Sequence, residues 1–164
     1  MSDHEHSRSR WTDHPRLRRW LAEQEAAFGE WAVSHPGEWD FSVASVDALE
    51  RAVRRDFAPS GWEGVRAAQH TSLVIAPAWY FGEVCVRAGA VWKVNPATDF
   101  STWDGPFVGV PDDPMEDPDH EDLYEDDDYL PASVPVTELR GMFLKDPPWQ
   151  LRDVVGEFET WRRG

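Results

Sequence analysis

The chain has 164 residues, a single cysteine and a net charge of −15. At this length it can bury a core of its own without metal or disulfides, and one cysteine excludes an intrachain disulfide. The longest apolar run, residues 73–81, is far shorter than the ~20 residues that a membrane span needs. We therefore expect no membrane partner, and the single cysteine suits a cytoplasmic protein. We also expect no nucleic acid partner, because phosphates repel an acidic chain.

The first part of the chain predicts a tail and a long helix. Residues 1–11 are polar and predict a flexible tail, and a single domain is expected over residues 12–164. A proline near the start and a His-Pro-Gly turn at the end place the first helix over residues 15–34, with Thr12 or Asp13 as its cap. The apolar side chains spaced three and four apart on this helix are Leu17, Trp20, Leu21, Ala27, Phe28 and Trp31.

Two more helices are expected before the middle of the chain. Ser45 is a good cap for a helix over residues 46–57. Ser60 and Glu63 have the spacing of a capping box, which predicts a further helix from about residue 62 into the central apolar stretch.

The central stretch, residues 76–96, predicts a buried helix that turns directly into a strand over residues 90–95. Gly82 costs helix stability, so we expect another element to approach it closely. Gly89 is expected to end the helix in a left-handed conformation. Pro77 predicts a kink or a helix start.

The last third predicts two strands and a closing helix. The strands are expected over residues 107–110 and 133–139, and a break at residues 146–148 precedes the helix. We therefore predict an α+β fold: N-terminal helices, a central buried helix, a small antiparallel sheet of about three strands and a C-terminal helix. The apolar face of that last helix is expected to comprise Leu151, Val154, Val155, Phe158 and Trp161.

Several motifs resemble a group of small, uncharacterised bacterial domains of actinobacterial type. They are Trp39-Asp-Phe-Ser, Ser45-Val-Asp-Ala-Leu-Glu, and Trp79-Tyr-Phe-Gly-Glu-Val with Arg87, Gly89 and Trp92. The resemblance covers roughly residues 39–110, and the chain departs from it at Phe81, where those domains usually carry Leu, and at Pro77. It implies a helix that leads through a glycine into a Trp-containing strand, and it transfers no site.

The acidity is concentrated in an insertion at about residues 111–130. Eleven acidic residues and no Lys or Arg lie between Asp112 and Asp128, so subtracting them from the net charge of −15 leaves −4. We expect a mobile loop that binds a basic protein partner, with two tyrosines as anchors. The predicted partner-binding residues are Asp112, Asp113, Glu116, Asp117, Asp119, Glu121, Asp122, Tyr124, Glu125, Asp126, Asp127, Asp128 and Tyr129.

Two other readings of the insertion stay open. A run of charge also serves merely to keep a protein soluble. Calcium binding would require carboxylates around a turn glycine, and no glycine occurs between Pro111 and Pro131, which disfavours it. The leading hypothesis is a non-enzymatic interaction domain, such as an immunity or antitoxin-like factor or a regulatory factor.

The alternative function is a small enzyme with a site near Glu83 and Tyr80. The spacing of Glu83 and Arg87 favours an intrahelical ion pair over a catalytic carboxylate. Cys85 lies among apolar residues, where a reactive thiolate is disfavoured. The histidines show no metal-ligand spacing and no phosphate-binding glycine loop is present, so we expect no cofactor.

Overall fold

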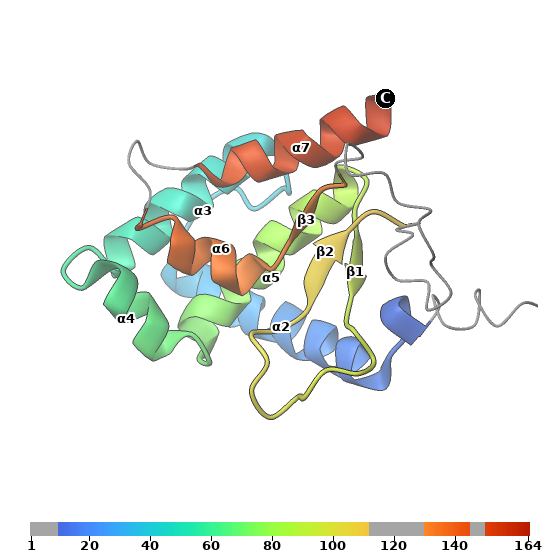
Figure 1. Ribbon diagram of the computed structural model, residues 1–164. Helices are drawn as coiled ribbons and strands as arrows, with labels where there is room; N and C mark the ends of the chain where they lie inside the picture. Colours follow the sequence, from blue (N-terminus) through green and yellow to red (C-terminus); the bar gives the residue numbers. More distant parts are fainter. Residues whose placement is uncertain (1–9, 112–129, 145–149) are drawn as a thin grey trace, which may run out of the picture.

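A computed structural model describes residues 10–111, 130–144 and 150–164 (Figure 1). These residues form helices, then a three-stranded sheet, then two further helices, which confirms the predicted α+β fold. The elements are α2 (Pro15–Ser34), α3 (Val43–Asp56), α4 (Gly61–Ala68), α5 (Ser72–Arg87), β1 (Val91–Lys93), β2 (Phe107–Gly109), β3 (Ala132–Ser133), α6 (Pro135–Gly141) and α7 (Leu151–Arg163).

Helix α2 has the predicted bounds but a different cap. The Nδ1 atom of His14 accepts a hydrogen bond from the backbone N–H of Arg16 at 3.1 Å, so neither Thr12 nor Asp13 is the cap. Pro15 is the first helical residue, and this makes the residue directly before it the cap. The buried face of α2 also includes Gln24, which its polar side chain concealed in the sequence.

Helix α3 begins three residues earlier than predicted. Its cap is Ser42, whose hydroxyl accepts a hydrogen bond from the backbone N–H of Ser45 at 3.2 Å. Ser45 is therefore a helical residue and not the predicted cap. Its buried hydroxyl is used elsewhere, because it accepts a hydrogen bond from the Tyr80 hydroxyl at 2.7 Å.

Helices α4 and α5 are separate, although the sequence predicted one continuous helix. A turn over residues 69–71 divides them, and the extended backbone of Thr71 begins α5. Ser60 precedes α4 but makes no side-chain capping bond, so the predicted capping box is absent there. Helix α5 runs through Pro77, which is therefore not a helix start.

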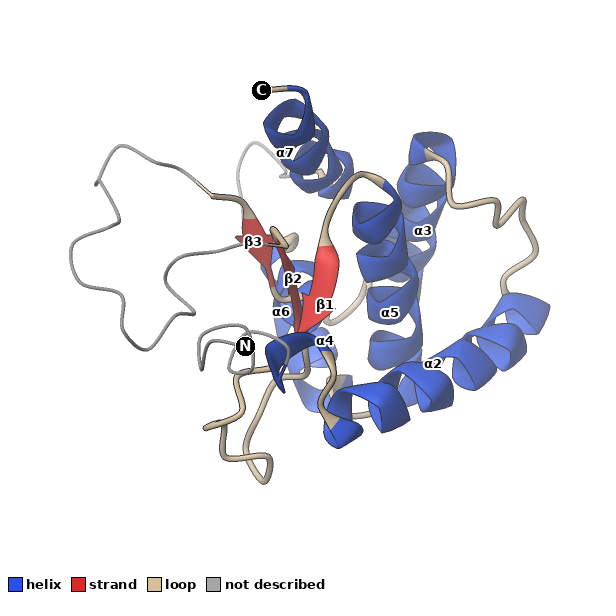
Figure 2. Cartoon of the chain, turned by 90° about the vertical axis from the view of Figure 1, so that its right-hand side faces the viewer, coloured by secondary structure: helices blue, strands red, loops and turns tan. Residues whose placement is uncertain are grey.

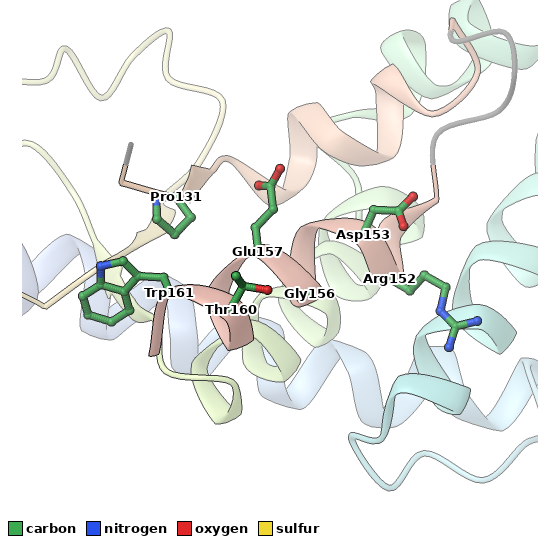
Figure 3. A pocket seen from close by; sticks show the side chains of 7 residues that line it. All are labelled: Pro131, Arg152, Asp153, Gly156, Glu157, Thr160 and Trp161. Atoms are coloured by element: carbon green, nitrogen blue, oxygen red, sulfur yellow. The ribbon is translucent and has the colours of Figure 1, made fainter. Parts of the chain in front are cut away.

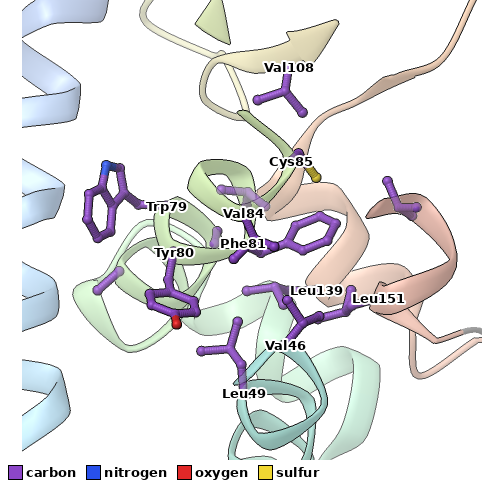
Figure 4. Packing of buried hydrophobic residues seen from close by; sticks show 14 of the residues in the cluster. Val46, Leu49, Trp79, Tyr80, Phe81, Val84, Cys85, Val108, Leu139 and Leu151 are labelled. Atoms are coloured by element: carbon purple, nitrogen blue, oxygen red, sulfur yellow. The ribbon is translucent and has the colours of Figure 1, made fainter. Parts of the chain in front are cut away.

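Helix α5 is the centre of the core, as predicted. It packs against α2, α3, α6 and α7 and against β1 and β2. Figure 4 shows Phe81 and Cys85 on the side of α5 that faces Leu139 and Leu151, with Tyr80 near Leu49. All six side chains are fully buried.

Gly82 is the point where β1 approaches α5. A Cβ atom added to Gly82 would lie 2.1 Å from the end of the Trp92 indole, so the glycine leaves the space that the ring fills. Trp92 also donates a hydrogen bond from Nε1 to Glu83 Oε2 at 2.7 Å. These contacts confirm the predicted close approach.

The predicted ion pair between Glu83 and Arg87 is wrong. Glu83 binds Trp92 instead, and the Arg87 guanidinium lies 3.9 Å from the centroid of the Phe41 ring. Both partners come from outside the helix, where spacing along α5 could not reveal them.

The sheet has the order β1-β2-β3, with both pairs antiparallel. It lies against α5, with β1 at one edge and next to the central strand β2 (Figure 2). Gly89 has a φ of 122° and connects α5 to β1, as predicted.

The third strand is shorter than predicted. The sequence predicted a strand over residues 133–139, but β3 ends at Ser133 and Pro135 starts α6. Proline fixes a φ suited to a first helical turn and cannot donate a ladder hydrogen bond. Val136 and Leu139 are three residues apart, so both face the core from one side of the helix.

Candidate functional site

The predicted partner-binding residues, Asp112 to Tyr129, lie outside the described residues. The residues that flank them are described. Gly109 of β2 pairs with Ala132 of β3 in an antiparallel register. Both ends of the acidic insertion therefore meet at one end of the sheet.

A surface groove lies beside this end of the sheet. Its volume is about 530 Å³, which is within the range of ligand-binding pockets. One wall is Pro131, which directly precedes β3, and the rest is α7 (Figure 3). The lining residues, here called the α7 groove, are Pro131, Arg152, Asp153, Gly156, Glu157, Thr160 and Trp161.

Helix α7 places the six lining residues that belong to it on its outer side. Its inner side buries Leu151, Val154, Val155 and Phe158, and the helix packs against α3 and α5. The positions of α7 that line the groove form two rows with a spacing of four residues, which keeps the members of a row on one face. One row is Asp153, Glu157 and Trp161, and the other is Arg152, Gly156 and Thr160.

Gly156 forms an open part of the groove. Within the described part of the chain, a Cβ atom added there would meet no atom within 4 Å. A mid-helix glycine costs about 1 kcal/mol relative to alanine. Among the residues that the structure describes, no packing contact at this position offsets that cost.

The charge of the groove is mainly negative. At one end Arg152 forms an ion pair with Asp47 of α3, with 3.4 Å between nitrogen and oxygen, so its charge is matched. Asp153 accepts a hydrogen bond from the backbone N–H of Gln150 at 3.3 Å and remains exposed. Glu157 is half-buried in the middle of the row.

Trp161 closes the groove at the end next to Pro131 (Figure 3). Its indole is only partly buried, which corrects the prediction that Trp161 belongs to the apolar face of this helix. An aromatic ring beside two carboxylates suits a cationic side chain, because the ring face attracts a cation and the carboxylates accept its hydrogen bonds. Successive members of the row Asp153, Glu157 and Trp161 are four residues apart, and that spacing was the signal for this row in the sequence.

Tyr80 and Glu83, the predicted enzymatic alternative, do not lie in this groove. The Tyr80 hydroxyl donates to Ser45 and accepts from the backbone N–H of Phe41 at 2.7 Å, and the side chain is fully buried. Burial raises the pKa of Tyr80. Both residues thus have partners that hold the core together.

The surroundings of Cys85 make its thiol unreactive, as predicted. Its side chain is fully buried in α5. Burial raises the pKa of the Cys85 thiol, and the negative charges of Glu138 and Glu157 raise it further. The thiolate that nucleophilic chemistry requires is therefore strongly disfavoured.

Within the described parts of the chain, no group of three or more His, Cys, Asp or Glu side chains is arranged to hold a metal ion. Each helix in those parts is also too short or too polar to cross a bilayer. Comparison with protein-family models, with curated proteins and with solved structures finds no match.

Proposed function

We propose that this chain is a non-enzymatic interaction domain that binds a basic segment of a protein partner. The observation that carries the proposal is the row of Asp153, Glu157 and Trp161 beside Pro131, where the acidic insertion rejoins the sheet. The class of protein that fits is an immunity or antitoxin-like factor, or a regulatory factor that neutralises a basic surface.

The groove and the insertion have complementary roles in this proposal. Eleven carboxylates in the insertion supply a long-range field that accelerates the encounter with a cationic partner. The groove supplies a shaped, partly apolar surface, where an aromatic residue such as Trp161 contributes affinity. An arginine of the partner would place its guanidinium over the indole and against Glu157.

The test uses an Arg-Gly repeat peptide and fluorescence anisotropy. We expect Trp161→Ala and the Asp153→Asn/Glu157→Gln pair each to weaken binding about tenfold, since each removes a strong contact. Replacing every Asp and Glu between 112 and 128 with Asn or Gln should slow association and reduce its dependence on salt.

The matched control is Glu23→Gln/Glu30→Gln, which removes two exposed charges from α2. Any acidic protein attracts a cationic peptide weakly, so this control measures that background. If the control weakens binding as much as the groove variants do, the groove is not the binding site. If the neutralised insertion alters solubility and leaves the association rate unchanged, the insertion is solubilising only.

A further inference from the structure

A second hollow lies at the junction of α2 and α3 and has the opposite charge. Its volume is about 400 Å³ and its lining is largely polar. It is separate from the α7 groove, with which it shares no lining residue. The residues that line it, here called the α2–α3 pocket, are Ser34, His35, Pro36, Trp39, Ala48, Arg51, Ala52, Arg55 and Asp56.

Two arginines dominate this pocket. Arg51 and Arg55 are four residues apart on α3, so both lie on the same face of the helix. Within the described residues, neither guanidinium forms an ion pair or a hydrogen bond. This is unexpected in a chain with almost twice as many acidic as basic side chains, 31 against 16.

The C-terminal end of α3 does not account for both arginines. Basic residues near a helix C-terminus are stabilised by the helix dipole, and Arg54 and Arg55 lie in that last turn. Arg54 binds the carbonyl oxygen of Met142 and the carboxylate of Glu50, at 3.2 Å in each case. Arg51 lies a full turn earlier and gains little from the dipole.

The rest of the pocket is held in place by hydrogen bonds. His35 has acceptors at both ring nitrogens: Nδ1 is 2.8 Å from the carbonyl oxygen of Trp31, and Nε2 is 2.7 Å from Asp56 Oδ2. These two contacts fix the orientation of the ring and hold Asp56 against it. The Trp31 ring stacks on His35 with a centroid distance of 3.8 Å.

Trp39 forms a fixed aromatic wall. Its Nε1 donates to the carbonyl oxygen of His35 at 2.9 Å, and its ring packs edge-on against Tyr80 with centroids 5.5 Å apart. Asp56 is bonded to His35, so Arg51 and Arg55 are the charged side chains of the pocket without a bonded partner among the described residues. A site with two guanidinium groups fits a dianion better than a single carboxylate, which one arginine can bind in bidentate fashion.

We infer that the α2–α3 pocket binds a small phosphate monoester, with Arg51 and Arg55 holding the phosphate group and Trp39 beside the body of the ligand. The volume of the pocket is that of a site for a small molecule. This site would give the protein a small-molecule ligand in addition to its basic partner.

Isothermal titration calorimetry with inorganic phosphate, AMP and acetate at constant ionic strength tests this inference. We expect phosphate and AMP to bind the full chain and acetate to bind more weakly. Arg51→Gln/Arg55→Gln should weaken phosphate binding tenfold or more. The loss of even one charge-assisted hydrogen bond would weaken binding about tenfold. Arg51→Lys/Arg55→Lys should give an intermediate affinity, because lysine keeps the charge but lacks the planar fork.

The matched control is Arg16→Gln/Arg66→Gln, which removes the same charge from exposed positions on α2 and α4. An equal loss of affinity in this control would overturn the inference, as would acetate binding as tightly as phosphate or the absence of phosphate binding. All the substituted arginines are exposed, so the variants should fold, which circular dichroism verifies. Tighter binding of AMP than of phosphate would support a contact with Trp39.

Discussion

Two glycines in the middle of helices, Gly82 in α5 and Gly156 in α7, are present for opposite physical reasons. The missing side chain at Gly82 leaves space that the Trp92 indole fills, whereas the space beside Gly156 is open. The first glycine closes the core and the second leaves a hollow on the surface. A glycine in the middle of a helix, which lowers the stability of that helix, therefore marks either close packing or an accessible site. Only the neighbours in three dimensions distinguish the two.

The same contrast holds for polar groups. In the core, the hydroxyl of Tyr80 and the carboxylate of Glu83 each have a hydrogen-bond partner from another element. Along the α7 groove, Asp153 bonds only to the backbone of its own helix end among the described residues, and it faces solvent. The core thus uses its polar groups for stability, while the groove keeps the carboxylate of Asp153 exposed.

The largest expected effect concerns Gly82. Gly82→Leu should reduce the free energy of unfolding by about 3 kcal/mol, which lowers the Tm by about 10 °C, because the side chain would overlap the Trp92 ring. That ring cannot move cheaply, since Glu83 holds its Nε1 and Trp20 packs on it with centroids 5.3 Å apart. Urea unfolding measures the loss, and a variant as stable as wild type would contradict the packing role of Gly82.

The second prediction concerns Tyr80. Tyr80→Phe should cost about 2 kcal/mol, because the variant leaves the hydroxyl of Ser45 and the backbone N–H of Phe41 without their shared partner. Phe41 has a φ of 63°, an unfavourable value for a side chain of its kind, and the hydrogen bond helps to hold it. Hydrogen exchange at the Phe41 amide should become faster. Unchanged exchange would show that the bond does not hold this loop.

The sequence predicted the core better than the surface site, for a physical reason. The end points of α2 and the role of Gly82 follow from local chemistry, such as a proline in a first turn or a glycine amid large apolar residues. Where two periodicities fit the same residues, the prediction failed: Val136 and Leu139 suit either a strand or a helix, and Pro135 decided for the helix.

The groove was missed because its residues appeared to belong to other patterns. Trp161 lies three residues after Phe158, a spacing that predicted a buried position, but it lies near the end of α7 and lines the groove instead. The α2–α3 pocket depends on contacts between separate elements, such as His35 with Asp56. Spacing along one helix cannot reveal such contacts.

The third prediction tests how closed the core is. The ordinary pKa of a cysteine thiol is 9.0, and burial raises that of Cys85. Above about pH 9 the unfolded chain therefore releases a proton that the folded chain retains, so stability falls as the pH rises, by at most about 1.4 kcal/mol per pH unit. Cys85→Ala removes this contribution and should flatten the decrease between about pH 9 and pH 10. Equal slopes in the two proteins would mean that the folded thiol ionises as readily as the unfolded one.

The smallest expected effect concerns Gly156 and separates stability from binding. Gly156→Ala should raise the free energy of unfolding by about 1 kcal/mol, because alanine favours the helix and its methyl group meets nothing. Gly156→Leu should also keep the fold but fill part of the groove between Asp153 and Trp161, and so weaken binding of the Arg-Gly repeat peptide. Urea unfolding and fluorescence anisotropy on both variants check these outcomes. If Gly156→Leu is stable and binds the peptide as wild type does, the open space at Gly156 has no part in partner binding. Gly82 and Gly156 would then differ only in whether another side chain packs against them.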